Sequence, residues 1–471
     1  MTDCCFPTIF NDTQRIDFTK NKIEAYERLS NSLKDIFDWD ASRTPFPGLF
    51  SFQEEDAGVY FGREDDILNS IQHLESIRRL KQDRANLVLL LGASGSGKSS
   101  LVRAGILPRL KKDNNWLIIK PFRPKNDPIS ELSISLSEAY KTINRLVGPE
   151  EISKELTTKT SGLYSYCFDL LNKSKNKDAT LLIVIDQAEE LFSQDISSNN
   201  AQFLQILNTT IRIAVAQVII ITILRSNFLE KFQNSSLVKD TMKEAEIRYS
   251  TLTLDTINLK KLPLIIEQPA ERAGVQIENG LVNLMINDAP SSDTLPLLAF
   301  TLKQLWTKYN TNGVITIDNY KELGGIEGSI MRAANNVIQT SNFTEDDLKI
   351  LRSIFISSLT GISNDGNYIK HTAHIDELEV GAERILKPFI EERLLVTDLD
   401  NTGKETIEIT HEALLRTWPL LSSWLSEDRD EIQLYENLRN AAQEWINEGQ
   451  ASDFLVHRDG RLEELRKLFK Y

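Results

Sequence analysis

The sequence predicts an α/β fold in which a five-stranded parallel sheet is followed by a helical domain, a winged-helix domain and a short C-terminal helical segment. Three observations lead to this prediction. Short apolar runs alternate with helical stretches as far as residue 255, a region without strand signals follows, and further helices precede a hairpin signal near residue 400. Apolar runs without polar alternation are typical of parallel strands that helices cover on both faces.

The five expected strands are short and almost entirely apolar. They are Leu87–Leu91, Trp116–Phe122, Leu181–Ile185, Val218–Leu224 and the weaker Tyr249–Leu254. The segments between them are long enough for right-handed crossover connections. We therefore assign residues 45–255 to one sheet domain. The run Pro45–Gly48 breaks regular structure before it, and residues 1–44 form a polar segment with one expected helix over residues 21–37.

The rest of the chain divides into three further parts. Residues 256–342 form an expected helical domain, and residues 426–471 are charged and helical. Between them, in residues 343–425, the helix Asp346–Leu359 precedes two alternating strands, Leu394–Asp398 and Thr406–Thr410. Helices followed by such a hairpin are the pattern of a winged helix.

The composition is globular with an acidic balance. The 471 residues include 54 Lys and Arg against 68 Asp and Glu, which gives a formal net charge of −14, and 41% are hydrophobic. These values exclude fibrous and wholly disordered classes. An acidic chain also disfavours a nucleic acid or an anionic membrane as the partner.

The cysteine count and the apolar runs predict a compartment. Cys4, Cys5 and Cys167 are too few for a disulfide framework, and nothing near Met1 resembles a signal peptide. The run Ile213–Leu224 is too short to span a bilayer and reads as a buried strand. We therefore expect a soluble, cytoplasmic protein without a membrane partner.

The strongest motif follows the first strand directly. Gly92, Ala93, Ser94, Gly95, Ser96, Gly97, Lys98 and Ser99 match G-x-x-x-x-G-K-[ST] at every fixed position, and Ser100 comes next. Glycines let backbone N–H groups surround a phosphate chain, and the helix that begins here points its positive end at the same anion. We expect these nine residues to bind the phosphates, with Lys98 on the β- and γ-phosphates and Ser99 on Mg²⁺.

An acidic residue leaves the third strand. Asp186 follows Leu181–Ile185, where a carboxylate can hold Mg²⁺ through water opposite Ser99. Glu189 and Glu190 come three and four positions later and are candidates for polarising an attacking water. Alternatively, both glutamates stabilise the start of a helix.

The fourth strand ends at Arg225. Ligands of parallel sheets bind at the carboxyl ends of the strands, so Arg225 is a candidate for neutralising a γ-phosphate, with a solvated arginine as the alternative. The guanine-reading N-K-x-D motif does not occur in the sequence. Adenine is therefore favoured, and the expected ligands are ATP or ADP with Mg²⁺.

Several ordered segments carry a family resemblance. They are Phe46–Leu49 with Phe61–Glu64, Lys98–Pro108, Asp186–Phe192, Leu295–Leu298 with Leu305–Trp306, Gly324–Gly328 and Thr410–Trp418. Together they resemble the STAND class of signal-transduction ATPases, which is related to AAA+ ATPases, and specifically its bacterial novel STAND NTPase type. The resemblance implies a nucleotide-binding domain, a helical lid over residues 256–342 and a winged helix that close over ATP or ADP.

The resemblance also implies roles for individual residues. Pro296 would pack near the adenine, Arg63 would help to line the adenine pocket, and Arg225 would be a sensor of the nucleotide. His411 would contact the β-phosphate of ADP and hold the resting state. From the sequence alone, His411 is a histidine at the end of a wing strand, which is more often structural.

Three functions remain open at this point. The first is a regulatory switch that exchanges ADP for ATP, forms a homo-oligomer, hydrolyses ATP slowly and answers to an unidentified protein trigger or effector, in roles such as bacterial defence or stress signalling. The second is a continuously cycling AAA+-like loader or remodeller, which the net charge of −14 disfavours on DNA. The third is a nucleotide-binding scaffold without turnover.

Overall fold

The structure is a computed structural model of the 471-residue chain. It describes residues 37–79, 86–93, 95–125, 127–174, 176, 178–192, 198–213, 217–235, 248–288, 295–363, 366–392, 394–399, 404–410 and 412–447. Most of the helix expected over residues 21–37 lies outside the described residues, as does the hairpin turn at residues 400–403. The chain divides into two compact units, residues 1–319 and 320–471. This division falls inside the segment that the sequence assigns to one helical domain.

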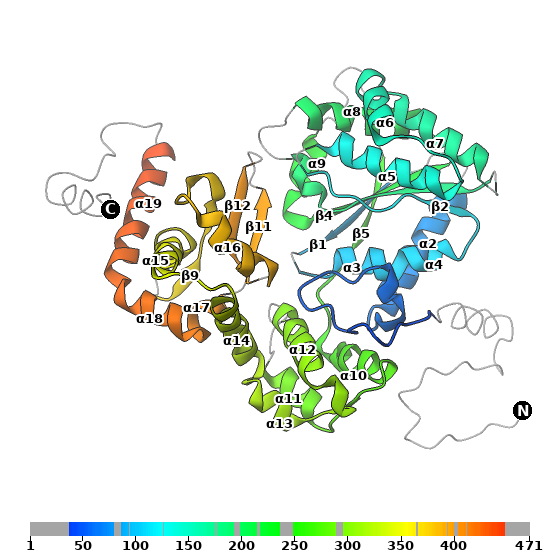
Figure 1. Ribbon diagram of the computed structural model, residues 1–471. Helices are drawn as coiled ribbons and strands as arrows, with labels where there is room; N and C mark the ends of the chain where they lie inside the picture. The colour runs from blue at the N-terminus through cyan, green and yellow to red at the C-terminus, as the bar shows by residue number, and fades with distance from the viewer. Residues whose placement is uncertain are drawn as a thin grey trace, which may run out of the picture. The chain divides into compact units, whose positions relative to one another are not determined.

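The first unit is built on a parallel sheet, which confirms the predicted α/β fold (Figure 1). Its strand order is β2-β3-β4-β1-β5. The strands are β1 Leu87–Gly92, β2 Trp116–Ile118, β3 Thr180–Ile185, β4 Val218–Arg225 and β5 Tyr249–Thr253. All four neighbouring pairs run parallel. The second strand is shorter than expected, and Phe122 makes only an isolated bridge with Ile185.

Helices cover both faces of this sheet because its central strands are buried on both sides. Every residue of β1 and β3 is buried. Along β1, Leu87, Leu89 and Leu91 belong to one hydrophobic cluster, whereas Val88 and Leu90 belong to the other. This alternation is what the two-residue period of a strand dictates. The sequence therefore shows a continuous apolar run.

The helices divide between the two faces according to these clusters. Helix α2 and the helical run after β1 share one cluster with Val88, and α5, α7 and α8 share the other with Leu89. Their bounds are α2 Glu64–Arg79, α3 Lys98–Ser100, a π-helical turn Leu101–Ile106, α4 Leu107–Lys111, α5 Pro128–Thr142, α6 Pro149–Thr158, α7 Gly162–Lys173, α8 Ser198–Ile213 and α9 Leu229–Asn234.

After β5 the first unit continues mainly as helices. They are α10 Leu262–Arg272, α11 Leu281–Asp288 and α12 Leu295–Tyr309, and α13 Ile317–Glu322 ends across the boundary of the two units. A short parallel pair, β6 Gln276–Ile277 with β7 Val314–Ile315, is an addition that the sequence did not suggest. Within the described residues, no helix combines the length and the hydropathy needed to cross a membrane.

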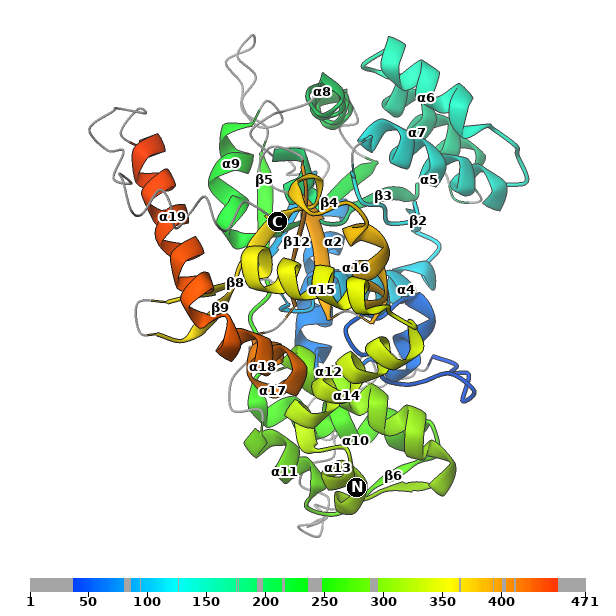
Figure 2. The same cartoon turned by 60° about the vertical axis from the view of Figure 1, so that its left-hand side comes forward.

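The second unit combines helices with a small antiparallel sheet. Strand β12 lies between β10 and β11, and β11 pairs with β12 in the expected hairpin. Helix α19 contacts β8, and Figure 2 shows it beside β8 and β9. The elements are α14 Gly325–Thr340, α15 Glu345–Ser353, a π-helical turn Ile354–Leu359, β8 Thr360–Ile362, β9 Tyr368–Lys370, β10 Thr372–His374, α16 Ala382–Glu391, β11 Leu395–Leu399, β12 Glu405–Ile409, α17 Ala413–Thr417, α18 Pro419–Glu427 and α19 Arg429–Asn447.

An aromatic cluster forms the centre of the second unit. Trp418 is fully buried between α17 and α18. Its ring lies 5.8 Å from those of Phe355 and Phe389 and 6.1 Å from that of Trp424. Its indole Nε1 donates a hydrogen bond to Asn335 Oδ1 at 3.0 Å. The indole therefore joins several helices and satisfies its one polar group.

Truncating this tryptophan tests the role of the cluster. Trp418→Ala should lower the free energy of unfolding of the second unit by about 3–5 kcal/mol, because it leaves a cavity and an unpaired amide. Urea denaturation followed by circular dichroism measures the change. Val380→Ala is the control because Val380 is 99% exposed. Equal effects of the two substitutions would contradict the prediction.

Candidate nucleotide-binding site

The glycine-rich loop joins β1 to the helical run that begins at Lys98. Gly95 and Gly97 have φ angles of 73° and 89°, which glycine adopts without strain. At Gly92, a Cβ would lie 2.6 Å from the carbonyl oxygen of Leu254 and 2.8 Å from Ser96 Oγ. Two glycines are therefore needed for their backbone angles and the third for close packing.

The lysine of the loop is folded back onto the loop itself. Lys98 is buried, and its Nζ donates hydrogen bonds to the carbonyl oxygens of Gly92 at 2.9 Å and Ala93 at 2.7 Å. The pKa of Lys98 is lowered by burial, and the nearby carboxylates of Glu189 and Asp186 offset only part of this shift. Carbonyl oxygens are weaker partners for an ammonium group than anionic oxygens. A phosphate is therefore well suited to replace them.

The next residue of the helical run contacts the acidic residue that follows β3. Ser99 Oγ donates to Asp186 Oδ1 at 2.7 Å, and Asp186 is 4% exposed. The other oxygen, Oδ2, accepts from Arg103 Nε at 3.3 Å and from its terminal nitrogen at 3.1 Å. A hydroxyl and a carboxylate are the oxygen donors that Mg²⁺ prefers, together with phosphate oxygens. Ser99 and Asp186 therefore fit the predicted magnesium site.

Glu189 and Arg225 form a second charged pair next to Lys98. Arg225 Nε lies 3.0 Å from Glu189 Oε1, and the Glu189 side chain is only 10% exposed. Burial raises the pKa of Glu189, although the charges of Arg225 and Lys98 lower it in part. The second oxygen, Oε2, is buried and has no hydrogen-bond partner among the described residues. The carboxylate thus has one oxygen in an ion pair and one available for a ligand.

Glu190 points to a different environment from Glu189. One of its oxygens accepts from an Arg123 guanidinium nitrogen at 2.9 Å, and the other accepts from the backbone N–H of Lys125 at 2.7 Å. Both oxygens are therefore occupied by the loop that follows β2. These contacts favour a structural role for Glu190 and leave Glu189 as the better candidate for acting on water.

Two arginines that the sequence did not assign to the phosphate loop are part of the site. Arg63 is 5% exposed, and its terminal nitrogen donates to the carbonyl oxygens of Ser96 and Asp255, both at 2.8 Å. It ties the loop to the segment after β5. Arg103 contacts Asp186 as described above. Its position four residues after Ser99, which places both on one helical face, was the available signal.

Other predicted site residues are placed only in part. Ser100 Oγ accepts from the backbone N–H of Phe52 at 3.1 Å, so its hydroxyl is directed to the segment before α2. Pro296 is the second residue of α12, but its side chain is not described. Ser94 and His411 lie outside the described residues. The nucleotide contacts of these four residues stay predictions.

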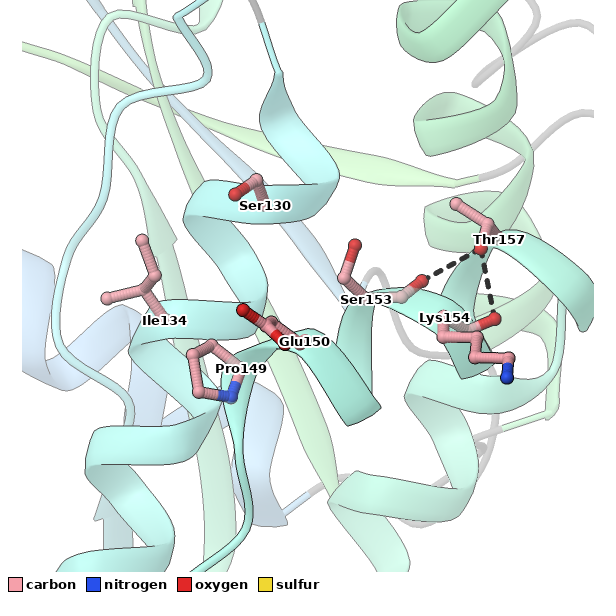
Figure 3. Close-up of a pocket in the computed structure, with 7 residues that line it drawn as sticks. All are labelled: Ser130, Ile134, Pro149, Glu150, Ser153, Lys154 and Thr157. Atoms are coloured by element: carbon pink, nitrogen blue, oxygen red, sulfur yellow. Dashed lines mark hydrogen bonds between the residues drawn. The ribbon is translucent and has the colours of Figure 1, made fainter.

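A shallow hollow of about 400 Å³ lies elsewhere in the first unit, between α5 and α6 (Figure 3). It is lined by Ser130, Ile134, Pro149, Glu150, Ser153, Lys154 and Thr157. The Thr157 hydroxyl is bonded to the carbonyl oxygens of Ser153 and Lys154, as Figure 3 shows. None of the lining residues comes from the glycine-rich loop or the strand ends, so this hollow is separate from the site.

A family model described as novel STAND NTPase 1 matches residues 45–453. The chain belongs to the novel STAND NTPase 1 family. It is therefore a P-loop NTPase, as the glycine-rich loop and the parallel sheet also indicate. A comparison with curated proteins finds no match to this novel STAND NTPase.

Two solved structures show partial similarity to the chain. A Walker-type ATPase of Pyrococcus abyssi is 16% identical, with a TM-score of 0.39, and the match covers 80% of this chain and 98% of that one. The ORC2 protein of Aeropyrum pernix in ADPNP–ADP complexes is 13% identical, with a TM-score of 0.43, over 78% of this chain and 95% of that one.

The close packing at Gly92 generates a test of the loop. Gly92→Ala should weaken nucleotide binding at least tenfold, because the new methyl group meets a backbone carbonyl that cannot move away cheaply. Calorimetric titration with ADP measures the effect. Gly148→Ala is the matched control, since nothing lies within 4 Å of its Cβ position. Unchanged affinity in Gly92→Ala would show that the loop tolerates the methyl group.

Proposed function

We propose that this P-loop NTPase is an ATP-binding regulatory switch that hydrolyses ATP slowly with Mg²⁺ and exchanges ADP for ATP to become active. The observation that carries the proposal is the ion pair between Arg225 and Glu189 beside Lys98. It occupies the two side chains that sensing and hydrolysis would require. An enzyme with this pair closed is held in a resting arrangement, which supports slow, regulated turnover.

Nucleotide binding in this proposal begins at the glycine-rich loop. Backbone N–H groups of the loop would surround the phosphates, and Lys98 Nζ would leave the carbonyl oxygens of Gly92 and Ala93 for the β- and γ-phosphates. Ser99 and Asp186 would hold Mg²⁺, whose charge stabilises the phosphates. The absence of the guanine-reading motif favours adenine.

Hydrolysis then depends on separating the charged pair. Arg225 would turn to the γ-phosphate, where its charge favours the transition state. Glu189 would then accept a proton from a water molecule. The water oxygen forms a bond to the γ-phosphorus, the bond from that phosphorus to the bridging oxygen breaks, and ADP leaves with the electron pair. Glu190, held by Arg123 and Lys125, would keep the loop after β2 in place.

Single substitutions distinguish the role of Glu189 in turnover from the role of Lys98 in binding. Glu189→Gln should retain ATP binding but lower turnover by about a hundredfold or more, because the amide cannot accept the proton. Lys98→Ala should lose ATP binding itself. Phosphate release and calorimetric binding are the measurements. Unchanged ATP affinity in Lys98→Ala would remove the basis of the proposed site.

The pH dependence adds a second check on Glu189. Burial raises the pKa of Glu189. As the pH falls, turnover of the parent enzyme should therefore decline at a higher pH than it would if the base were an exposed glutamate. Below the raised pKa the carboxyl group is protonated and cannot act as a base. Glu189→Gln should lack this acid limb. The same limb in the variant would assign the titration to another group.

The switch itself is proposed to act through His411 and self-association. The family resemblance implies that His411 would contact the β-phosphate of ADP and would stabilise the resting state. His411→Ala should therefore form larger species with ATP at lower protein concentration than the parent does, as light scattering would measure. The Lys98→Ala/His411→Ala double variant is the control, because it cannot respond to ATP. If His411→Ala with ATP stays as monomeric as the parent, the proposed role of His411 in the switch is wrong.

A trigger or effector protein, and roles in defence or stress signalling, belong to the same proposal. They rest on the family resemblance. Rapid turnover of the purified protein without any trigger would favour a continuously cycling machine. Tightly bound nucleotide without phosphate release over hours would favour a scaffold. Slow turnover, with ADP-bound monomers and larger ATP-bound species, is the outcome that the switch predicts.

A further inference from the structure

Arg103 joins Asp186, the acidic residue that follows β3, to a segment that lies before the sheet. It stands one helical turn after Ser99, and its side chain is 18% exposed. Two of its nitrogens contact Asp186 Oδ2 at 3.1 and 3.3 Å. Its remaining terminal nitrogen donates to Gln53 Oε1 at 3.3 Å. The guanidinium group therefore bridges two parts of the chain.

Gln53 is held so that its amide oxygen is available to Arg103. Its backbone N–H donates to Asp56 Oδ2 at 2.7 Å at the start of the short 3-10 helix Glu54–Val59. Its side-chain Nε2 donates to the carbonyl oxygen of Ser51 at 2.9 Å and to the hydroxyl of Ser51 at 3.0 Å. The amide nitrogen thus faces its own segment, and the amide oxygen faces the helical run.

The same segment is attached at further points. The backbone N–H of Phe52 donates to Ser100 Oγ at 3.1 Å, and the ring of Phe52 lies 5.2 Å from that of Tyr60. Asp56 is 8% exposed in its side chain and pairs with Arg43 at 2.9 Å. Residues 51–56, called the clamp segment below, therefore contact the helical run at both Ser100 and Arg103.

These contacts restrict the orientation of the Asp186 carboxylate. Ser99 holds Oδ1 and Arg103 holds Oδ2, so rotation of the carboxylate breaks at least one charge-assisted hydrogen bond. Groups that hydrogen-bond to a metal-binding carboxylate set its direction and typically affect metal affinity strongly. Arg103 is placed for that role, with Gln53 supporting it from the clamp segment.

We propose that Arg103 is the positioning residue that orients Asp186 toward Mg²⁺, and that the clamp segment acts on the metal through Gln53. The inference rests on the proposed function, because it assumes that Ser99 and Asp186 hold the Mg²⁺ of a bound nucleotide. It assigns Arg103 no contact with the nucleotide. Displacing the clamp segment would loosen Asp186 and weaken the Mg²⁺-dependent part of binding alone.

The test compares ADP affinity with and without Mg²⁺ in the full chain. Calorimetry gives the dissociation constant of ADP in excess Mg²⁺ and in EDTA. The constant in EDTA divided by the constant in Mg²⁺ measures the contribution of the metal. Arg103→Ala should reduce that ratio by about tenfold or more, with the EDTA affinity unchanged. Arg103→Lys, which keeps the charge but not the paired donors, should lose less, and Gln53→Ala should show a smaller loss in the same direction.

Arg109→Ala is the matched control. It removes the same charge from α4 of the same helical run, where the Arg109 guanidinium bonds to the carbonyl oxygen of Gly105 at 2.8 Å. Its ratio should equal that of the parent. Circular dichroism during thermal unfolding shows whether each variant is folded, and Gln53→Ala, which keeps every charge, provides the readout if Arg103→Ala does not fold.

The outcomes separate this inference from the proposed function. A parent without ADP binding in either condition would overturn both. If the parent binds ADP but its ratio is near one, the inference alone is overturned. The same holds if Arg103→Ala and Gln53→Ala both keep the ratio of the parent. Loss of ADP binding in EDTA by a folded Arg103→Ala would also overturn it, because the arginine would then support the loop rather than the metal.

Discussion

Parallel pairing of β1 with β4, and of β4 with β3, is the constraint on which the site depends. The register sets Gly92 opposite Arg225 and Ile185 opposite Thr222. The glycine-rich loop, Asp186 and Arg225 therefore leave the sheet at the same edge, although long stretches of chain separate them. Both faces of β1 and β3 are buried, so apolar side chains pack these strands into the protein on either side of the sheet.

Buried charge is the second condition of the site. Lys98 and Asp186 are 9% and 4% exposed, and the Glu189 side chain is 10% exposed. Each of the three has an opposite charge or a carbonyl oxygen nearby. Burying a charge without a partner lowers the free energy of unfolding by roughly several kcal/mol. The resting pairs therefore stabilise the protein and also keep these groups from other partners. A bound nucleotide with its metal supplies charges of the kind that can replace them.

Much of this arrangement follows from local patterns. The strand, glycine loop and helix start predict the phosphate site because each depends on neighbours in sequence. The same reasoning could have found Arg103, because it lies four residues after Ser99 on the same helical face. Glu189 and Glu190 were not distinguishable in this way. They are adjacent in a 3-10 helix, where successive side chains point about 120° apart, and what lies on each side is contributed by distant residues.

By itself, the sequence determined the α/β class, the parallel five-stranded sheet and the nucleotide chemistry of the glycine-rich loop, because periodicity and short-range spacing carry that information. Only the tertiary structure decided that Arg225 pairs with Glu189, that Glu190 holds the loop after β2, and that Gln53 reaches Arg103. These contacts join residues far apart in the chain. Their partners are chosen by strand order and helix packing, which no local pattern of residues specifies.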